Sequence, residues 1–454
     1  GTASERTCRI DSFTLRIRSD IALTYRADDR HGSTVGRRLL AAVIVTLAIA
    51  GAGTAGSEPK PRFEVLAHAK APGGYSGDVV LHRGHAYLSS HRGDGACPAQ
   101  GVRVFSLADP RRPRRLAAFG RIPGTWTEKT IVRRVETAAF RGELAVTSVQ
   151  ACAPGSFRGF ALYDVTRPAR PRELARVRTD PRGSHEIWLQ PVGDKAYVYT
   201  AIIASEFRSS PDGTTPGEPD FRIVDVSDPR KPVVVGGWGA WRELGLAPFT
   251  DPSKRLEGNF VHSVVGDGTR AYLSYWDLGT VVLDVSKPSQ PRYLGRTRGE
   301  VDNSHSAWLG QNGLLVETHE ARGGTATFYR RGAGDPVRLS TFALPDAVVR
   351  QGHRARGIAP VSGLDLSDSV HDGKLRGSLA LFSWYGQGVV AADISDPRRP
   401  RFLARFLARP ETDPARLLCP GRRCTAVWGV DIEGETIVAS DLIGGLWVLR
   451  LRRD

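Results

Sequence analysis

The chain has 454 residues, of which 41% are hydrophobic and 24% charged, and its formal net charge at pH 7 is +15. A charge of this size is common in nucleic-acid-binding proteins, but here 55 Arg stand against 8 Lys, and many of the Arg occur in short turns spread along the chain. Because a groove-binding protein gathers its basic residues in one stripe, we expect no nucleic-acid partner.

The N-terminal region reads as a targeting segment. Residues 37–56 begin with Arg37 and Arg38, continue with about a dozen apolar residues and end in small residues. This pattern predicts a secretory signal peptide, too short to span a bilayer, with a retained anchor as the alternative. Residues 1–36 are predicted to be a disordered upstream extension, because the chain contains no Met to mark a start. We therefore expect a secreted or cell-surface protein that touches the membrane only through this segment.

Beyond it, one pattern recurs seven times: an apolar strand, usually an Asp, and a proline-bracketed turn followed by another short strand. Five copies are full, one at 325–339 is worn, and a half-copy begins at Pro61. The second prolines of the pattern lie 45 to 64 residues apart, at Pro61, Pro113, Pro171, Pro232, Pro291, Pro336 and Pro400. This spacing leaves room for four strands in each unit.

Upstream of the proline turns lie runs typical of hairpins, such as residues 78–90, 262–275 and 428–440, each with a Gly or Asp-Gly turn between β-branched and aromatic residues. A unit is thus predicted to have strands A and B in the hairpin, C before the proline turn and D after it. Such sheets bury their faces when they stack radially, which predicts an all-β fold, a β-propeller of four-stranded antiparallel blades.

The chain ends support a closed ring. The last unit stops after its C strand at residues 446–451, whereas the half-copy at Pro61 is a D strand without a unit. We expect this N-terminal strand to complete the last blade and remove two exposed edges. Residues 57–454 are therefore predicted to form one seven-bladed propeller. An open solenoid or two sandwiches would not explain this arrangement of the ends.

Four cysteines follow the signal segment. Cys97 and Cys152 fall in matching loops of adjacent blades, and Cys419 and Cys424 share the loop before blade 7. An even number in an exported protein favours disulfides, most simply Cys97 with Cys152 and Cys419 with Cys424. A zinc site is the alternative, although the short CxxxxC spacing has no CxxC partner.

At these repeats the chain resembles the LVIVD-repeat family. The resemblance is strongest at residues 224–232 ("VDVSDPRKP") and 283–291 ("LDVSKPSQP"), and it weakens in blade 5 and in blade 1, where Ser106 replaces the Asp. The members of this family look like β-propellers. They are exported or cell-surface proteins of bacteria and archaea, mostly without assigned activity. The resemblance therefore implies fold and location and little about chemistry.

Chemistry is expected where the channel opens, because the first residue of each A strand should lie at one mouth. Aligned hairpins place Asp78, Glu136, His185, His262, His305 and Trp428 there, with Asp365 as the best candidate in blade 6. Three imidazoles could hold Zn²⁺, Cu²⁺ or Fe²⁺ with a free position, or these residues could simply face a wet channel. Glu320, Asp277 and Asp441 are further candidate ligands, whereas His91, His319, His353 and His371 are expected in solvated loops.

The longest loops point to the same face. Loop residues on a rigid scaffold often carry binding, and aromatic side chains there could stack a sugar or grip a peptide. The candidate ligand-binding residues are Asp78, Trp241, Trp276, Asp277, Trp384, Tyr385, Trp428 and Asp441. No common hydrolase or nucleotide-binding motif occurs.

Two functions follow from the sequence. The first is a surface module that binds a protein, peptide or carbohydrate through its loop-rich face and channel mouth. The second is a metal-dependent hydrolytic or oxidative enzyme with His185, His262 and His305 as ligands and Glu136 or Glu320 as acid-base. Imidazole nitrogens that meet about 2.0–2.1 Å from one point would favour a metal.

Overall fold

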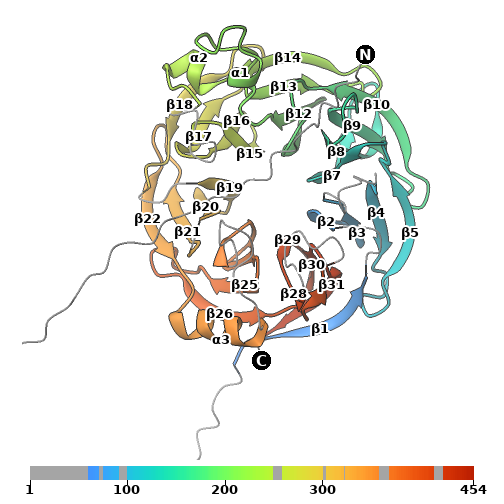
Figure 1. Ribbon diagram of the computed structural model, residues 1–454, viewed down its shortest axis with the longest axis vertical. Helices are drawn as coiled ribbons and strands as arrows, with labels where there is room; N and C mark the ends of the chain where they lie inside the picture. Colours follow the sequence, from blue (N-terminus) through green and yellow to red (C-terminus); the bar gives the residue numbers. More distant parts are fainter. Residues whose placement is uncertain are drawn as a thin grey trace, which may run out of the picture. The chain divides into compact units, whose positions relative to one another are not determined.

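The computed structural model describes residues 60–70, 75–91, 100–248, 258–299, 303–321, 323–356, 368–413 and 423–453. The compact unit comprises Lys60–Asp454, and residues 1–59 lie outside the described part, as do the predicted extension and signal peptide. Viewed down its short axis, the compact unit is a ring of sheets around a central axis (Figure 1).

The ring contains seven blades, each an antiparallel four-stranded sheet with strand A innermost. Blade 1 consists of β2 (Val79–His82), β3 (His85–Leu88), β4 (Val102–Ser106) and β5 (Arg114–Phe119). Blade 2 consists of β7 (Thr130–Glu136), β8 (Arg141–Ala151), β9 (Gly159–Asp164) and β10 (Arg172–Arg178). Blade 3 consists of β11 (Ile187–Val192), β12 (Lys195–Ala201), β13 (Phe221–Asp225) and β14 (Val233–Trp238). Blade 4 consists of β15 (Val261–Asp267), β16 (Arg270–Tyr275), β17 (Gly279–Asp284) and β18 (Arg292–Arg296). Blade 5 consists of β19 (Ser304–Leu309), β20 (Leu314–His319), β21 (Ala326–Arg330) and β22 (Val337–Phe342). Blade 6 consists of β23 (Asp372–Arg376), β24 (Leu379–Trp384), β25 (Gly388–Asp393) and β26 (Arg401–Phe406). Blade 7 consists of β29 (Val427–Glu433), β30 (Thr436–Asp441), β31 (Gly445–Arg452) and β1 (Arg62–Ala69). The remaining elements are β6 (Thr125–Trp126), β27 (Glu411–Thr412), β28 (Arg423–Cys424), α1 (Ser205–Arg208), α2 (Ala240–Leu244) and α3 (Asp346–Arg356).

The first strand closes the ring. β1 pairs antiparallel with β31 from Arg62 opposite Arg452 to Ala69 opposite Leu446, with one register shift near Val65. In Figure 1 this blue strand lies along the red strands of blade 7. The predicted seven-bladed ring and its closure by the N-terminal strand are therefore confirmed.

The repeated sequence pattern builds the turn between strands C and D. The second proline immediately precedes the D strand in all seven blades, as at Pro232 before β14. The Asp at the end of strand C accepts the N–H two residues later; Asp284 does so from Ser286 at 2.9 Å. The same carboxylate pairs with an Arg eight residues on, as Asp284 does with Arg292 at 2.8 Å. The pattern thus serves architecture, and many of its Arg are tied to acids.

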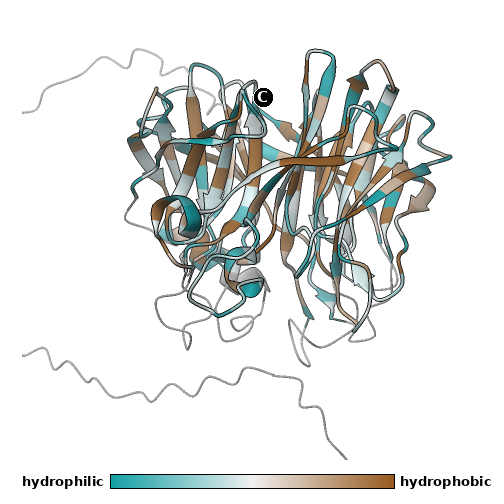
Figure 2. Cartoon of the chain, turned by 90° about the horizontal axis from the view of Figure 1, so that it is seen from above, coloured by the Kyte–Doolittle hydropathy of each residue, from teal (hydrophilic) through white to brown (hydrophobic). Residues whose placement is uncertain are grey.

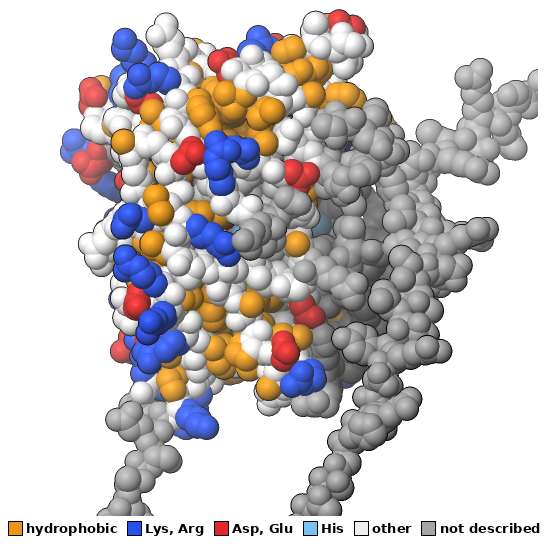
Figure 3. Space-filling view, turned by 90° about the vertical axis from the view of Figure 1, so that its left-hand side faces the viewer, with side chains coloured by type: hydrophobic (Ala, Val, Ile, Leu, Met, Phe, Trp, Pro, Cys, Tyr) orange, Lys and Arg blue, Asp and Glu red, His pale blue; other side chains and the backbone are white. Residues whose placement is uncertain are grey.

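The outer wall carries these charges without concentrating them. On the side shown in Figure 3, Lys and Arg lie among acidic and hydrophobic side chains. Because pairs such as Arg292 with Asp284 are largely exposed, each contributes little to stability.

The core lies between neighbouring blades. Tyr199 and Phe221 of blade 3, for example, pack against Val261 and Leu273 of blade 4, and all four are essentially buried. Figure 2 shows hydrophobic residues concentrated along the strands between the two faces. No helix in the described residues is long and apolar enough to cross a membrane.

Two of the four cysteines of the predicted disulfides lie in the described residues. Cys152 and Cys424 are each disulfide-bonded, whereas Cys97 and Cys419, their expected partners, lie outside the described residues. The pairing therefore stays a prediction. Peptide mapping without reduction is expected to recover Cys97 linked to Cys152 and Cys419 linked to Cys424, and any other linkage would contradict it.

Candidate functional site

Six side chains from consecutive blades meet at the loop-side end of the A strands. We call this set the mouth cluster; it comprises Glu128, His185, His262, His305, His371 and Trp428. Adjacent ring centroids lie 4.4 Å apart for His185 and His262, 4.2 Å for His262 and His305, 4.3 Å for His305 and His371, and 3.9 Å for His371 and Trp428. The Trp428 indole N–H donates to Glu128 Oε1 at 2.5 Å, which completes the arc.

Local irregularities aim these side chains at the channel. The A–B pairing skips His262, His305 and Trp428, each of which lies at a register shift at the start of its A strand. An extra residue in one strand of an antiparallel pair redirects its side chain, and such bulges are frequent beside active sites. The same irregularity thus redirects one side chain in each of blades 4, 5 and 7.

Short polar contacts fix several of these rings. His185 Nε2 lies 2.9 Å from His262 Nε2, and Gln150 Nε2 lies 2.9 Å from His185 Nδ1. His371 Nδ1 donates to the Trp428 carbonyl oxygen at 2.7 Å, which leaves its Nε2 as the acceptor nitrogen. His371 can therefore offer a lone pair through Nε2 alone.

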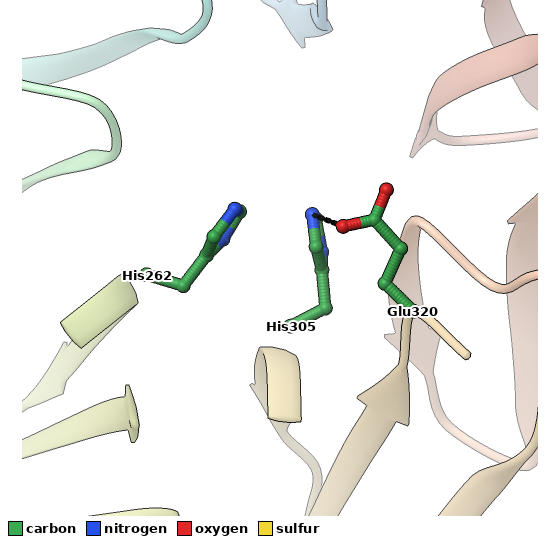
Figure 4. Close-up of side chains that lie close together, drawn as sticks. All are labelled: His262, His305 and Glu320. Atoms are coloured by element: carbon green, nitrogen blue, oxygen red, sulfur yellow. Dashed lines mark ion pairs between the residues drawn. The ribbon is translucent and has the colours of Figure 1, made fainter. Parts of the chain in front are cut away.

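Glu320, just after β20, stands beside the imidazoles. Its Oε2 lies 3.5 Å from His305 Nε2, and the Tyr385 hydroxyl donates to its Oε1. Figure 4 shows His262, His305 and Glu320 directed toward one another, and their potential ligand atoms all lie within 4.8 Å. Nitrogen and oxygen ligands stand about 2.0–2.2 Å from a bound zinc ion, so small side-chain movements would close these atoms around a cation.

Burial controls the charge of the mouth cluster. Desolvation lowers the pKa of His262 to about 3 and those of His185, His305 and His371 well below the usual value. The imidazoles are therefore neutral near pH 7, the form that binds metals. Burial also raises the pKa of Glu320 to about 7 and that of Glu128 well above its usual value.

A group of buried charged side chains lies next to the mouth cluster in the sequence and in the ring. Lys129 Nζ contacts Asp78 Oδ2 at 3.0 Å, Glu186 Oε2 at 3.2 Å and Asp372 Oδ2 at 3.0 Å, and all four side chains are buried. We call these residues the Lys129 cluster. Lys129, Glu186 and Asp372 each directly follow a member of the mouth cluster in the sequence.

The structure brings most of the predicted site together. His185, His262 and His305 are neighbours as predicted, Trp428 adjoins them, and Glu320 reaches His305. Trp276 and Tyr385 contact this group through ring distances of 5.1 Å to His262 and 5.6 Å to His371. These side chains share one location although their blades are far apart in sequence.

The prediction for Glu136 was wrong. It ends β7 at the A–B turn, where its side chain is 56% exposed and pairs with Arg134. The corresponding residue at the mouth is Glu128, because blade 2 has the long strand β8 and its hairpin turns only at residues 137–140. Eight residues of shift place Glu136 at the opposite end of the strand.

Several other candidates have structural roles. Asp441 accepts backbone N–H groups of Ala426, Ile443 and Gly444, and Asp277 accepts that of Gly258. Trp384 is 1% exposed, and its indole N–H donates to the Asp368 carbonyl. Asp78 belongs to the Lys129 cluster, and Trp241 lies half-buried on α2, apart from the mouth cluster.

The expectation for the remaining histidines was also wrong in part. His319 and His371 are buried in strands or at their start, not solvated, and His91 packs between Trp126 and Trp428 at 4.5 and 4.8 Å. The His353 side chain and Asp365 lie outside the described residues. His371, Glu128 and Lys129 were missed, although the pairs His371–Asp372 and Glu128–Lys129 repeat the pattern of His185–Glu186.

Comparison with known proteins supports the fold. The LVIVD repeat model matches residues 217–238 and 261–298, so the chain carries LVIVD repeats in blades 3 and 4. No curated protein matches the chain.

Solved structures similar to this chain include two propellers. Virginiamycin B lyase from Staphylococcus aureus has a TM-score of 0.50 at 9% identity, covering 87% of this chain and 100% of that one. Raptor from Chaetomium thermophilum has a TM-score of 0.52 at 11% identity, covering 87% of this chain and 30% of that one. Identities this low support the fold alone.

Proposed function

We propose that this β-propeller is a binding module whose ligand site is the mouth cluster, and that the site holds a divalent transition-metal ion on His262, His305 and Glu320. One observation carries the proposal: two buried, neutral imidazoles and a carboxylate, from two adjacent blades, offer their ligand atoms within 4.8 Å of one another. His185, with its Nε2 2.9 Å from that of His262, supplies a further nitrogen.

The charge balance supports a cation here. Glu128, Glu320, Asp78, Glu186 and Asp372 are five carboxyl groups around the mouth, whereas Lys129 is the one buried cation among the described residues they contact. Glu128 Oε2 has no hydrogen-bond partner among the described residues. Burial raises the pKa of Glu128 and Glu320 because their charged forms are costly here, and a divalent ion would stabilise the ionised form of both.

The ligand atoms of the site narrow the choice of metal ion. Imidazole with carboxylate suits zinc, copper and iron, whereas calcium and magnesium prefer oxygen ligands alone. When bound, such an ion would supply a Lewis-acidic position facing the loops. The protein's own contribution would be a fixed set of neutral imidazoles beside the Lys129 cluster.

We also propose that the protein acts outside the cytoplasm, on the support of the basic and apolar segment at residues 37–56. There its loop-rich face would be available to a surface ligand such as a protein, peptide or carbohydrate. The central site would remain the mouth cluster.

Metal analysis of the purified full chain tests this function. After exposure to Zn²⁺, Cu²⁺ or Fe²⁺ and extensive dialysis, we expect about one ion per chain with one of these metals. Loss of a direct ligand in His262→Ala should weaken binding by at least about 100-fold, since even outer partners of ligands typically contribute 10- to 100-fold.

His85→Ala is the matched control, because His85 lies at the A–B turn of blade 1 and bonds to the Arg83 carbonyl. It should bind metal as the unaltered chain does. Absence of metal from the unaltered protein, or equal binding by His262→Ala that is folded by circular dichroism, would refute the site.

A further inference from the structure

Two small aromatic clusters border the mouth cluster on its loop side. The first aromatic cluster comprises Phe260, Trp276 and Ala204, with Ile203 packed against it. The second comprises Tyr75, Tyr385, Ala426 and Leu442, with Trp428 and Ile443 packed against it. Both are separate from the larger hydrophobic clusters that hold neighbouring blades together.

The first aromatic cluster stands over His262. Trp276 follows β16 and Phe260 precedes β15, and their rings stack at 5.6 Å with an interplanar angle of 16°. The Trp276 ring lies 5.1 Å from that of His262 and 6.4 Å from that of His305. One wall of the proposed metal site is therefore an indole face.

The second aromatic cluster adjoins His371. Tyr385 lies 5.6 Å from His371 and 5.4 Å from Trp428, with nearly perpendicular rings in both pairs. Its hydroxyl is already used as a donor to Glu320, so its ring is what remains for contact. A second aromatic side chain thus borders the mouth cluster, beside His371.

From these walls we infer the kind of molecule that the site accepts: a small organic anion with one anionic head group and an aromatic body. The inference rests on the proposed metal function. The head, such as a carboxylate or phenolate, would bind the open position of the ion, and the body would pack against the rings of Trp276 and Tyr385. Aromatic pairs favour such offset and edge-to-face contacts over ring separations of about 4.5–7 Å.

The acidic groups around the mouth set the charge of this ligand. Glu128 and Glu320 flank the imidazoles, and the Lys129 cluster beside them holds three carboxyl groups for one lysine. Because Lys129 is already paired with these three carboxyl groups, a second negative charge on the ligand would find no free cation in that cluster, whereas an apolar body needs none. Monoanions with a ring should therefore bind better than small dianions such as inorganic phosphate.

Benzoate and acetate test this inference, because they share a carboxylate and differ in the phenyl ring. We would load the full chain with Co²⁺ and follow each titration by the visible absorption of the ion. Burying about 60–80 Å² of phenyl surface should make benzoate bind about 10- to 30-fold more tightly than acetate. Inorganic phosphate should bind no better than acetate.

Trp276→Leu should reduce the preference for benzoate to less than about 3-fold, measured as the ratio of the benzoate and acetate affinities of the same Co²⁺-loaded variant. Trp241→Leu is the matched control, since Trp241 lies on α2 and contacts no member of the mouth cluster through its ring among the described residues. Phe260→Leu gives the same test if Trp276→Leu does not fold, because Phe260 supports the indole.

The outcomes separate the two proposals. A chain that binds Co²⁺ but binds benzoate and acetate equally overturns the aromatic anion and leaves the metal site standing. A preference that survives in both Trp276→Leu and Phe260→Leu, or falls equally in Trp241→Leu, also overturns it. A chain that binds no Co²⁺ overturns both.

Discussion

A chain lacking residues 60–69 is expected to melt at least about 10 °C below the full chain. The deletion removes β1, which pairs with β31 along seven residue pairs and places Leu66 and Phe63 against the neighbouring blade cores. The lost ladder and apolar burial together amount to about 5–10 kcal/mol. This is comparable to the whole stability of a typical domain, about 5–15 kcal/mol. Thermal unfolding followed by circular dichroism measures the effect.

A matched pair in the same strand separates closure from general damage. Leu66 is 8% exposed within a core cluster, whereas Val65 is 46% exposed. Leu66→Ala should therefore cost about 2–4 kcal/mol, because it leaves a cavity, and Val65→Ala less than about 1 kcal/mol. An unchanged melting temperature after the deletion, or equal effects of the two substitutions, would contradict closure by β1.

The repeats made the fold predictable. A proline precedes the D strand in every blade, and in blades 2, 3, 4 and 6 an Asp accepts the N–H two residues on, as Asp225 does from Ser227; both are local features. The displaced copy at Pro61 then determines closure, because only blade 7 lacks a D strand. These inferences need no knowledge of loop conformation.

The site was predictable only where the hairpins are regular. Blades 3 to 5 align well, so His185, His262 and His305 were found. In blade 2 the eleven-residue strand β8 conceals the register, and Glu136 was chosen instead of Glu128. In blade 6 a long insertion before β23 hid His371. Side-chain burial depends on such registers, since a strand slipped along its partner exposes different residues.

The Lys129 cluster could not be predicted from the sequence, for a different reason. Its members come from blades 1, 2, 3 and 6, and Lys129 and Asp372 are 243 residues apart. No local sequence pattern identifies Lys129, because its carboxyl partners come close to it only when the ring of blades closes. The pairing of a mouth residue with a charged residue directly after it, as in His185–Glu186, is the one signal that the sequence offers.

Replacing Lys129 by Met should destabilise the protein by about 3–5 kcal/mol, because it leaves Asp78, Glu186 and Asp372 buried without their cation. Chemical denaturation of the full chain measures this loss. Lys195→Met is the matched control: Lys195 is 51% exposed and lies 3.6 Å from Asp225, so less than about 1 kcal/mol is expected.

A double variant tests whether the loss comes from the stranded charges. Combining Lys129→Met with Asp372→Asn removes the lysine together with one of the carboxylates it neutralises, so the two changes should cost clearly less together than the sum of the single effects. Simple additivity would mean that Lys129 contributes through its packing against Trp308, 5.4 Å away, and not through its charge.

The same substitution should have the opposite effect on metal binding. The positive charge of Lys129 helps to lower the pKa values of His262, His305 and His371, which means that it disfavours a cation at their position. The folded fraction of Lys129→Met should therefore bind Co²⁺ more tightly than the full chain, by about 3- to 10-fold if Coulomb interactions are screened as near a protein surface. Weaker binding would show that Lys129 acts on the mouth cluster as a support of its geometry. In that case Lys129→Met would lower both the stability of the protein and its affinity for Co²⁺. If the role of Lys129 is electrostatic, the stability falls and the affinity rises.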